Sequence, residues 1–199
     1  PPISNLWNYT QMGFDLVTFS GGKGLRGPQC SGLLLGRKDL IEAARHNNSP
    51  NSNTIGRGMK VGKEEIVALV AAVDWYLEQE DAAMEAEFRK RAERIAREVK
   101  SLPSVETHIF IPPVANHVPH LLITYDPARI KITGPEAQEK LRQGKPRIEL
   151  NPATGGGPAA EGLPGGSNTI VVGVWMLEPG EDAIVARRLR EVLREALRA

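Results

Sequence analysis

Apolar residues follow different periods in successive parts of the chain. Short apolar runs at 16–19 and 33–35 predict two buried strands joined by a glycine-rich turn. Over 63–101 the apolar residues recur every three, four or seven positions, which predicts one long amphipathic helix with a bend at the polar segment 78–81. Beyond residue 102 strand and helix patterns alternate, which predicts a small α+β region.

The α+β region has its own boundary signals. Thr133, Pro135 and Glu136 form a capping box with an early proline, so we expect a helix that Gly144 ends. The remaining elements are predicted as antiparallel strands over 105–111 and 119–125, further strands over 146–150 and 168–177, a loop over 154–167 and a last helix from about 179.

Composition and charge exclude little by themselves. The 199 residues include 25 basic and 24 acidic side chains, a net charge of +1, so the bulk balance requires neither nucleic acid nor an anionic membrane as partner. Cys30 is the only cysteine, which leaves no intrachain disulfide and no cysteine cluster for zinc. His117 and His120 have an odd spacing that sends their rings to opposite faces of a strand, so we expect no metal site.

No membrane segment or signal peptide is visible in the sequence. Apolar runs stay well short of the 18 or so residues that a membrane helix needs. We therefore expect no membrane partner and a cytoplasmic location. The chain opens without Met and reaches a strand that needs neighbours within about 15 residues, so we expect it to be the C-terminal part of a longer enzyme.

The most unusual chemistry lies in the turn between the two predicted strands. Lys23 stands among three glycines, which let a flat ligand approach the backbone closely. A lysine becomes a nucleophile where its surroundings favour the neutral amine, through desolvation or a neighbouring cation such as Arg26. Arg26, the Ser20 hydroxyl and the bare backbone at Gly22 could bind a phosphate. Together these groups predict a Schiff-base site for a phosphorylated aldehyde.

Two strings of this sequence resemble a known enzyme family. The strings are SGGKGLRGPQ followed by an apolar run and GRKDLI, and GRGMKVGKEEI from Gly56 onward. They resemble pyridoxal-phosphate enzymes of the aspartate aminotransferase superfamily. Within it, the chain is most similar to the branch of the bacterial L-seryl-tRNA(Sec) selenium transferases and D-glucosaminate-6-phosphate ammonia-lyases.

The resemblance implies an α/β fold: the C-terminal part of a fold type I large domain over 1–62, a long interdomain helix over 63–101 and a small α+β domain over 102–199. It also implies that the lysine matching Lys23 bears pyridoxal phosphate as an internal aldimine. From their positions relative to Lys23, we expect Ser20, Gly22 and Arg26 to be further cofactor contacts. A homodimer or larger homo-oligomer follows from the same likeness. The family's ring-stacking aromatic or histidine and its aspartate at the pyridine nitrogen belong to a preceding half that this chain does not contain.

The function expected from these features is that of a pyridoxal-phosphate-dependent lyase or transferase acting on an amino acid or amino sugar acid. β-Elimination or ammonia loss is favoured over β-replacement on seryl-tRNA because the net charge is near neutral. Arg57 and Lys60 are candidate contacts for a substrate carboxylate or phosphate.

Two interpretations from other classes remain open. Gly22, Gly24 and Gly27 match the dinucleotide fingerprint G-x-G-x-x-G, although a pyrophosphate site also requires a helix that opens at these glycines. The sequence that follows them predicts another strand. The second alternative is a non-catalytic assembly protein that retains the fold and has no use for Lys23.

Overall fold

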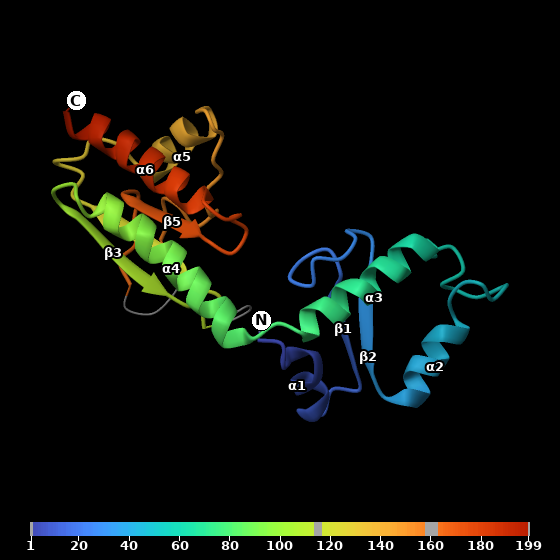
Figure 1. The fold of residues 1–199 in the computed structure, drawn as a ribbon. Helices are drawn as coiled ribbons and strands as arrows, with labels where there is room; N and C mark the ends of the chain where they lie inside the picture. Colours follow the sequence, from blue (N-terminus) through green and yellow to red (C-terminus); the bar gives the residue numbers. More distant parts are fainter. Residues whose placement is uncertain (1, 114–116, 158–162, 199) are drawn as a thin grey trace. The chain divides into compact units, whose positions relative to one another are not determined.

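The computed structural model describes residues 2–113, 117–157 and 163–198, which form two compact units. The first unit covers residues 1–81 and the second covers residues 82–199. Figure 1 colours them from blue through green to red along the sequence. Both contain helices and strands, as the α/β class predicts. The division into domains at residues 62 and 101 stays a prediction.

The first unit is built on a pair of antiparallel strands. β1 (Leu16–Ser20) pairs with β2 (Gly32–Gly36), and the register runs from Leu16 opposite Gly36 to Ser20 opposite Gly32. The helix α1 (Asn5–Gln11) contacts both strands, and α2 (Lys38–His46) follows β2 and contacts it. The lysine-containing turn therefore lies at one end of the pair and α2 begins at the other (Figure 1).

The two strands are less buried than their apolar sequences predict. Exposed and half-buried residues alternate along both strands, and Leu16 and Leu34 are 39% and 41% exposed. The expectation of two buried strands is therefore wrong for this structure. The physical reason is the number of strands: among the described residues no third strand pairs with β1 or β2, so both edges of the pair are uncovered.

The helix predicted over 63–101 is two helices. α3 spans Lys63–Leu77 and α4 spans Asp81–Val99. The break covers residues 78–80, within the polar segment where the sequence indicates a bend. Asp81 helps to fix this point, because its carboxylate accepts the backbone N–H of Ile3 at 2.9 and 3.0 Å. The prediction of one continuous helix is thus wrong at a position where polar side chains replace the apolar stripe.

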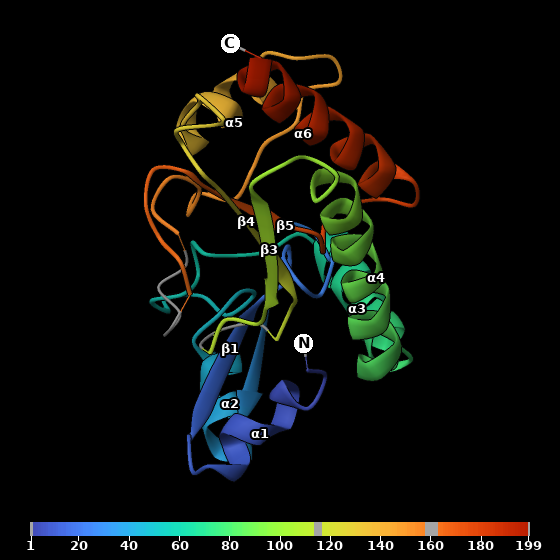
Figure 2. The same cartoon turned by 90° about the vertical axis from the view of Figure 1, so that its left-hand side faces the viewer.

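The second unit packs helices against a three-stranded antiparallel sheet. Its strands β3 (Val105–Phe110), β4 (His120–Tyr125) and β5 (Thr169–Gly173) lie in that order. α4 and α6 (Glu181–Arg198) lie on one face of the sheet in both views (Figures 1 and 2). Their core side chains include Ile95 and Val99 of α4 and Leu189 and Leu193 of α6, all fully buried.

The boundary signals of the second unit are mostly confirmed. α5 (Gly134–Arg142) begins with the predicted capping box, in which the Thr133 hydroxyl accepts from the Glu136 N–H and the Glu136 carboxylate accepts from the Thr133 N–H. The strand predicted over 146–150 is wrong: Ile148 and Leu150 are buried, but the Ile148 N–H donates to the Leu141 carbonyl instead of to a strand. Of the predicted loop over 154–167, residues 158–162 lie outside the described residues.

None of the helices in the described part of the chain combines the length and the apolar character that crossing a membrane requires.

Replacing Leu193 by Ala tests the core of the second unit. Leu193 is fully buried, so the substitution should lower the free energy of unfolding by about 2–5 kcal/mol through lost transfer energy and a cavity. Urea denaturation followed by circular dichroism measures this loss. Ile184→Ala on the same helix is the control, because Ile184 is 36% exposed and its truncation should cost clearly less. Equal losses would contradict the packing described above.

Candidate functional site

The lysine turn, residues 20–31, joins β1 to β2 and is closed by its own backbone. The Gly21 N–H donates to the Ser31 carbonyl at 2.9 Å, and the Gly27 N–H donates to the Gly21 carbonyl at 2.8 Å. Inside this loop the Arg26 N–H donates to the Lys23 carbonyl at 2.9 Å. The Leu25 side chain is buried and anchors the turn, whereas Lys23 and Arg26 on either side of it are exposed.

Two of the glycines in the turn are required by close packing. A Cβ on Gly21 would lie 2.0 Å from the Ser31 hydroxyl oxygen, and one on Gly22 would lie 2.5 Å from the Gln29 Cα. A side chain also stabilises this segment, since the Gln29 amide donates to the Gly22 carbonyl at 2.9 Å. Gly24 differs, because a Cβ there would meet no atom within 4 Å. The lysine is thus held on a rigid backbone with open space next to it.

The side chains that the sequence assigns to a cofactor are accessible in this turn. Ser20 is exposed at the end of β1, and Lys23 is exposed at the tip of the turn. Within the described part of the chain, neither side chain has a hydrogen-bond or ion-pair partner. Arg26 adopts a positive φ of 57°, and its guanidinium carbon lies 5.7 Å from the centroid of the Trp75 ring on α3. The three residues share one turn, and no hydrogen bond or ion pair joins their side chains.

The carboxylates nearest in the sheet lie at its other end. Arg37 bridges Asp15 and Asp39 at 3.0 and 2.7 Å, beside the Leu16–Gly36 end of the strand pair. The hydrogen bond from Arg37 lowers the pKa of the Asp39 carboxyl below its usual value. These acidic side chains are therefore already paired, and they do not neutralise the cations of the lysine turn.

Arg57 and Lys60 belong to a second part of the same unit. Arg57 is half-buried and its guanidinium donates to the Ser49 hydroxyl at 3.1 Å. Ser49 and the exposed Lys60 both line a pocket of about 780 Å³ between β2, the loop at 48–50 and α3. Ser49 therefore relates the two residues: it accepts a hydrogen bond from Arg57 and lines the same pocket as Lys60. The structure does not place Lys23, Ser20 or Arg26 among the residues that line this pocket.

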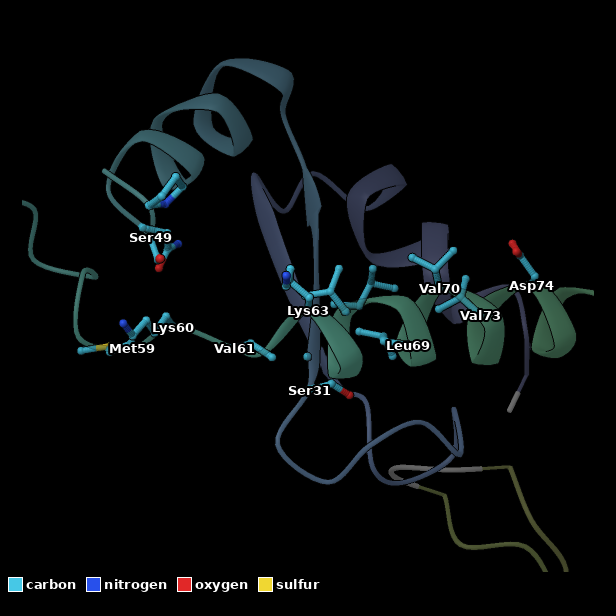
Figure 3. A pocket seen from close by; sticks show the side chains of 15 residues that line it. Ser31, Ser49, Met59, Lys60, Val61, Lys63, Leu69, Val70, Val73 and Asp74 are labelled. Atoms are coloured by element: carbon cyan, nitrogen blue, oxygen red, sulfur yellow. The ribbon is translucent and has the colours of Figure 1, made fainter. Parts of the chain in front are cut away.

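The pocket also contains residues that the sequence analysis did not single out. Figure 3 shows Lys63, Val70, Val73 and Asp74 projecting from α3, with Met59, Lys60 and Val61 on the segment that leads into this helix. Ile66 and Val70 are among the apolar residues that recur along the helix predicted over 63–101, yet they are 53% and 57% exposed. A signal was available: residues 66–73 are all apolar, and a helix that is apolar on every side predicts more than one apolar contact surface.

Two other kinds of site, a metal site and a dinucleotide site, can be tested against the described residues. The described residues contain no group of three or more His, Cys, Asp or Glu side chains that could hold a metal ion. A dinucleotide site at Gly22, Gly24 and Gly27 requires a helix that opens there, but the turn leads directly into the strand β2. The backbone amides of the turn therefore do not form a helix N-terminus for a pyrophosphate.

Comparisons with known proteins agree on one enzyme family. The family model for L-seryl-tRNA selenium transferase matches residues 3–115. A 5'-C-glycyluridine monooxygenase-decarboxylase from Streptomyces sp is 32% identical over 145 residues, which cover 73% of this chain and 35% of that protein. The L-seryl-tRNA(Sec) selenium transferase of Proteus mirabilis is 42% identical over 73 residues, or 37% of this chain and 14% of that enzyme.

A solved structure shares the fold of the whole chain. The structure of D-glucosaminate-6-phosphate ammonia-lyase aligns with a TM-score of 0.67 at 23% sequence identity. The alignment covers 94% of this chain and 46% of that one. The chain thus spans less than half the length of this structure, and about a third of the Streptomyces relative.

Substitution by alanine should lower the stability of the chain at Gly22 but not at Gly24. Gly22→Ala places a methyl group 2.5 Å from the Gln29 backbone, so we expect a loss of about 1–3 kcal/mol in the free energy of unfolding and faster tryptic cleavage after Lys23. Gly24→Ala meets open space and should leave both values near those of the unmodified chain. Urea denaturation and timed proteolysis give the comparison. A Gly24 variant as damaged as the Gly22 variant would argue against this geometry.

Proposed function

Because the chain belongs to the L-seryl-tRNA selenium transferase family, we propose that it is part of a pyridoxal-phosphate-dependent lyase or transferase that binds its cofactor through Lys23. The single observation that supports this assignment most is the exposed Lys23 side chain, which has no hydrogen-bond or ion-pair partner among the described residues, on a backbone-closed glycine turn. The substrate, the reaction and the cofactor contacts below are part of the same proposal.

The residues of the lysine turn fit pyridoxal phosphate. The cofactor needs a primary amine for its aldehyde and hydrogen-bond donors for its phosphate. Lys23 offers the amine, and the open space at Gly24 leaves room beside it. Ser20 and Arg26, three residues before and after the lysine, offer a hydroxyl and a guanidinium for the phosphate. The backbone at Gly22 is fixed by the Gln29 amide and positions the lysine.

Each of these residues has a distinct task in the proposed reaction. When bound, pyridoxal phosphate draws electrons away from the α-carbon of an amino acid substrate. The Lys23 Nζ would take up and return the α-proton of the substrate. Arg57 and Lys60 bind a substrate carboxylate or phosphate, with Arg57 oriented by its hydrogen bond to Ser49.

The names of the relatives support an amino acid or amino sugar acid as substrate class. Glycyl, seryl and glucosaminate groups are each an amino acid or a derivative of one, and they occur in the names of a decarboxylase, a transferase and a lyase. β-Elimination or ammonia loss remains the favoured reaction, and β-replacement on seryl-tRNA is less favoured because the net charge of the chain is only +1.

Replacing Lys23 by Arg tests the proposal directly. The unmodified chain mixed with pyridoxal phosphate should show a visible absorption band, and borohydride should convert it to a reduced adduct that peptide mapping places on Lys23. Arg keeps the positive charge but forms no such adduct under these conditions, so both signals should disappear in Lys23→Arg.

Lys38→Arg is the matched control, since Lys38 is another exposed lysine of the first unit, on α2. It should retain the band and the adduct on Lys23. An absent band, or adducts scattered over surface lysines, would remove the cofactor assignment and favour the non-catalytic assembly protein.

A further inference from the structure

The Arg26 guanidinium lies over an aromatic side chain from a distant part of the sequence. Its carbon atom is 5.7 Å from the centroid of the Trp75 ring, within the range of a cation–π interaction. Arg26 itself has a φ of 57°, a conformation that non-glycine residues seldom adopt. A strained backbone and an aromatic contact at the same residue indicate that the direction of this side chain is set by its surroundings.

Trp75 belongs to α3, the helix that packs against the lysine turn. Leu69 of α3 is 8% exposed, and its Cδ1 would lie 3.0 Å from a Cβ built on either Gly21 or Gly27. The Ala72 Cβ would lie 3.5 Å from the same position on Gly27. Leu69, Ala72 and Trp75 follow one another at intervals of three residues, so one side of α3 contacts the turn from its glycines to Arg26.

The contact with Trp75 leaves the hydrogen-bonding edge of Arg26 available. A cation–π contact is made by the charge of the guanidinium and uses none of its five N–H donors in a hydrogen bond. Among the described residues no acceptor is bonded to the Arg26 side chain. The arrangement therefore combines a cation held in one orientation with donors that are free to bind an anion.

We propose that Trp75 is a positioning residue that orients the Arg26 guanidinium for the phosphate group of pyridoxal phosphate at the lysine turn. This inference rests on the proposed function, because it takes Lys23 as the residue that binds the cofactor. It adds a residue of α3, 52 positions after Lys23 in the sequence, to the phosphate site. Trp75 acts through Arg26 and does not touch the cofactor.

A comparison of the affinities for pyridoxal and pyridoxal phosphate distinguishes this role of Trp75 from simple support of the fold. Both have the aldehyde that reacts with Lys23, but only the second has the phosphate. If Trp75 orients Arg26, then Trp75→Leu should weaken binding of pyridoxal phosphate about two- to fivefold, the value of an exposed cation–π contact, and leave pyridoxal binding unchanged. A variant that merely loosens the turn would weaken both ligands equally.

The experiment titrates the full chain with each compound and follows the absorption band. Trp75→Phe keeps an aromatic face and should recover most of the affinity for pyridoxal phosphate. Trp7→Leu is the matched control, because Trp7 lies in the same unit and is 43% exposed, close to the 42% of Trp75. This substitution should change the affinity for neither compound. Arg26→Leu should weaken binding of pyridoxal phosphate at least as much as Trp75→Leu does, and the double variant should bind it no more weakly than Arg26→Leu alone.

The outcomes distinguish the two proposals. Equal weakening of pyridoxal and pyridoxal phosphate in Trp75→Leu, or no change in either, would overturn the role of Trp75 while the cofactor assignment stands. Additive losses in the double variant would also overturn it. If the unmodified chain binds neither compound at Lys23, the proposed function itself fails and this inference fails with it.

Discussion

The close approach of the backbone at Gly21 and Gly22 to the segment 29–31 is the constraint on which the candidate site depends. A single methyl group on either glycine would lie 2.0 to 2.5 Å from atoms of Ser31 or Gln29. The turn can close only because those side chains are absent, and closure presents Lys23 outward while Leu25 is buried beside it. The position of Lys23 is therefore a consequence of close packing at the two glycines.

This constraint relates the lysine turn to the rest of its unit. α3 contacts the glycines with Leu69 and the arginine with Trp75, so the helix fixes both the backbone of the turn and the direction of one of its cations. The same helix forms one wall of the pocket that Ser49 and Lys60 line, and the Ser49 hydroxyl accepts a hydrogen bond from Arg57. A single helix thus borders both groups of residues that the sequence assigns to cofactor and substrate.

Local signals in the sequence predicted local structure well. The Thr133 capping box, the strands around residues 105 and 125 and the last helix are confirmed because each depends on residues close in sequence. The wrong predictions have two different causes. The burial of β1 and β2 requires neighbouring strands that the described chain does not supply, and the continuity of the helix over 63–101 fails where polar residues interrupt its apolar stripe. The contact between Arg26 and Trp75 had no sequence signal, because 49 positions separate the two residues.

The central claim is that one lysine of this chain binds pyridoxal phosphate. Its most direct measurement is the number of reduced pyridoxyl groups retained per chain, determined by intact mass after saturation with the cofactor and borohydride treatment. We expect a plateau at one group per chain as the cofactor concentration rises. A value that stays at zero, or one that climbs through several groups without a plateau, would contradict a single lysine site.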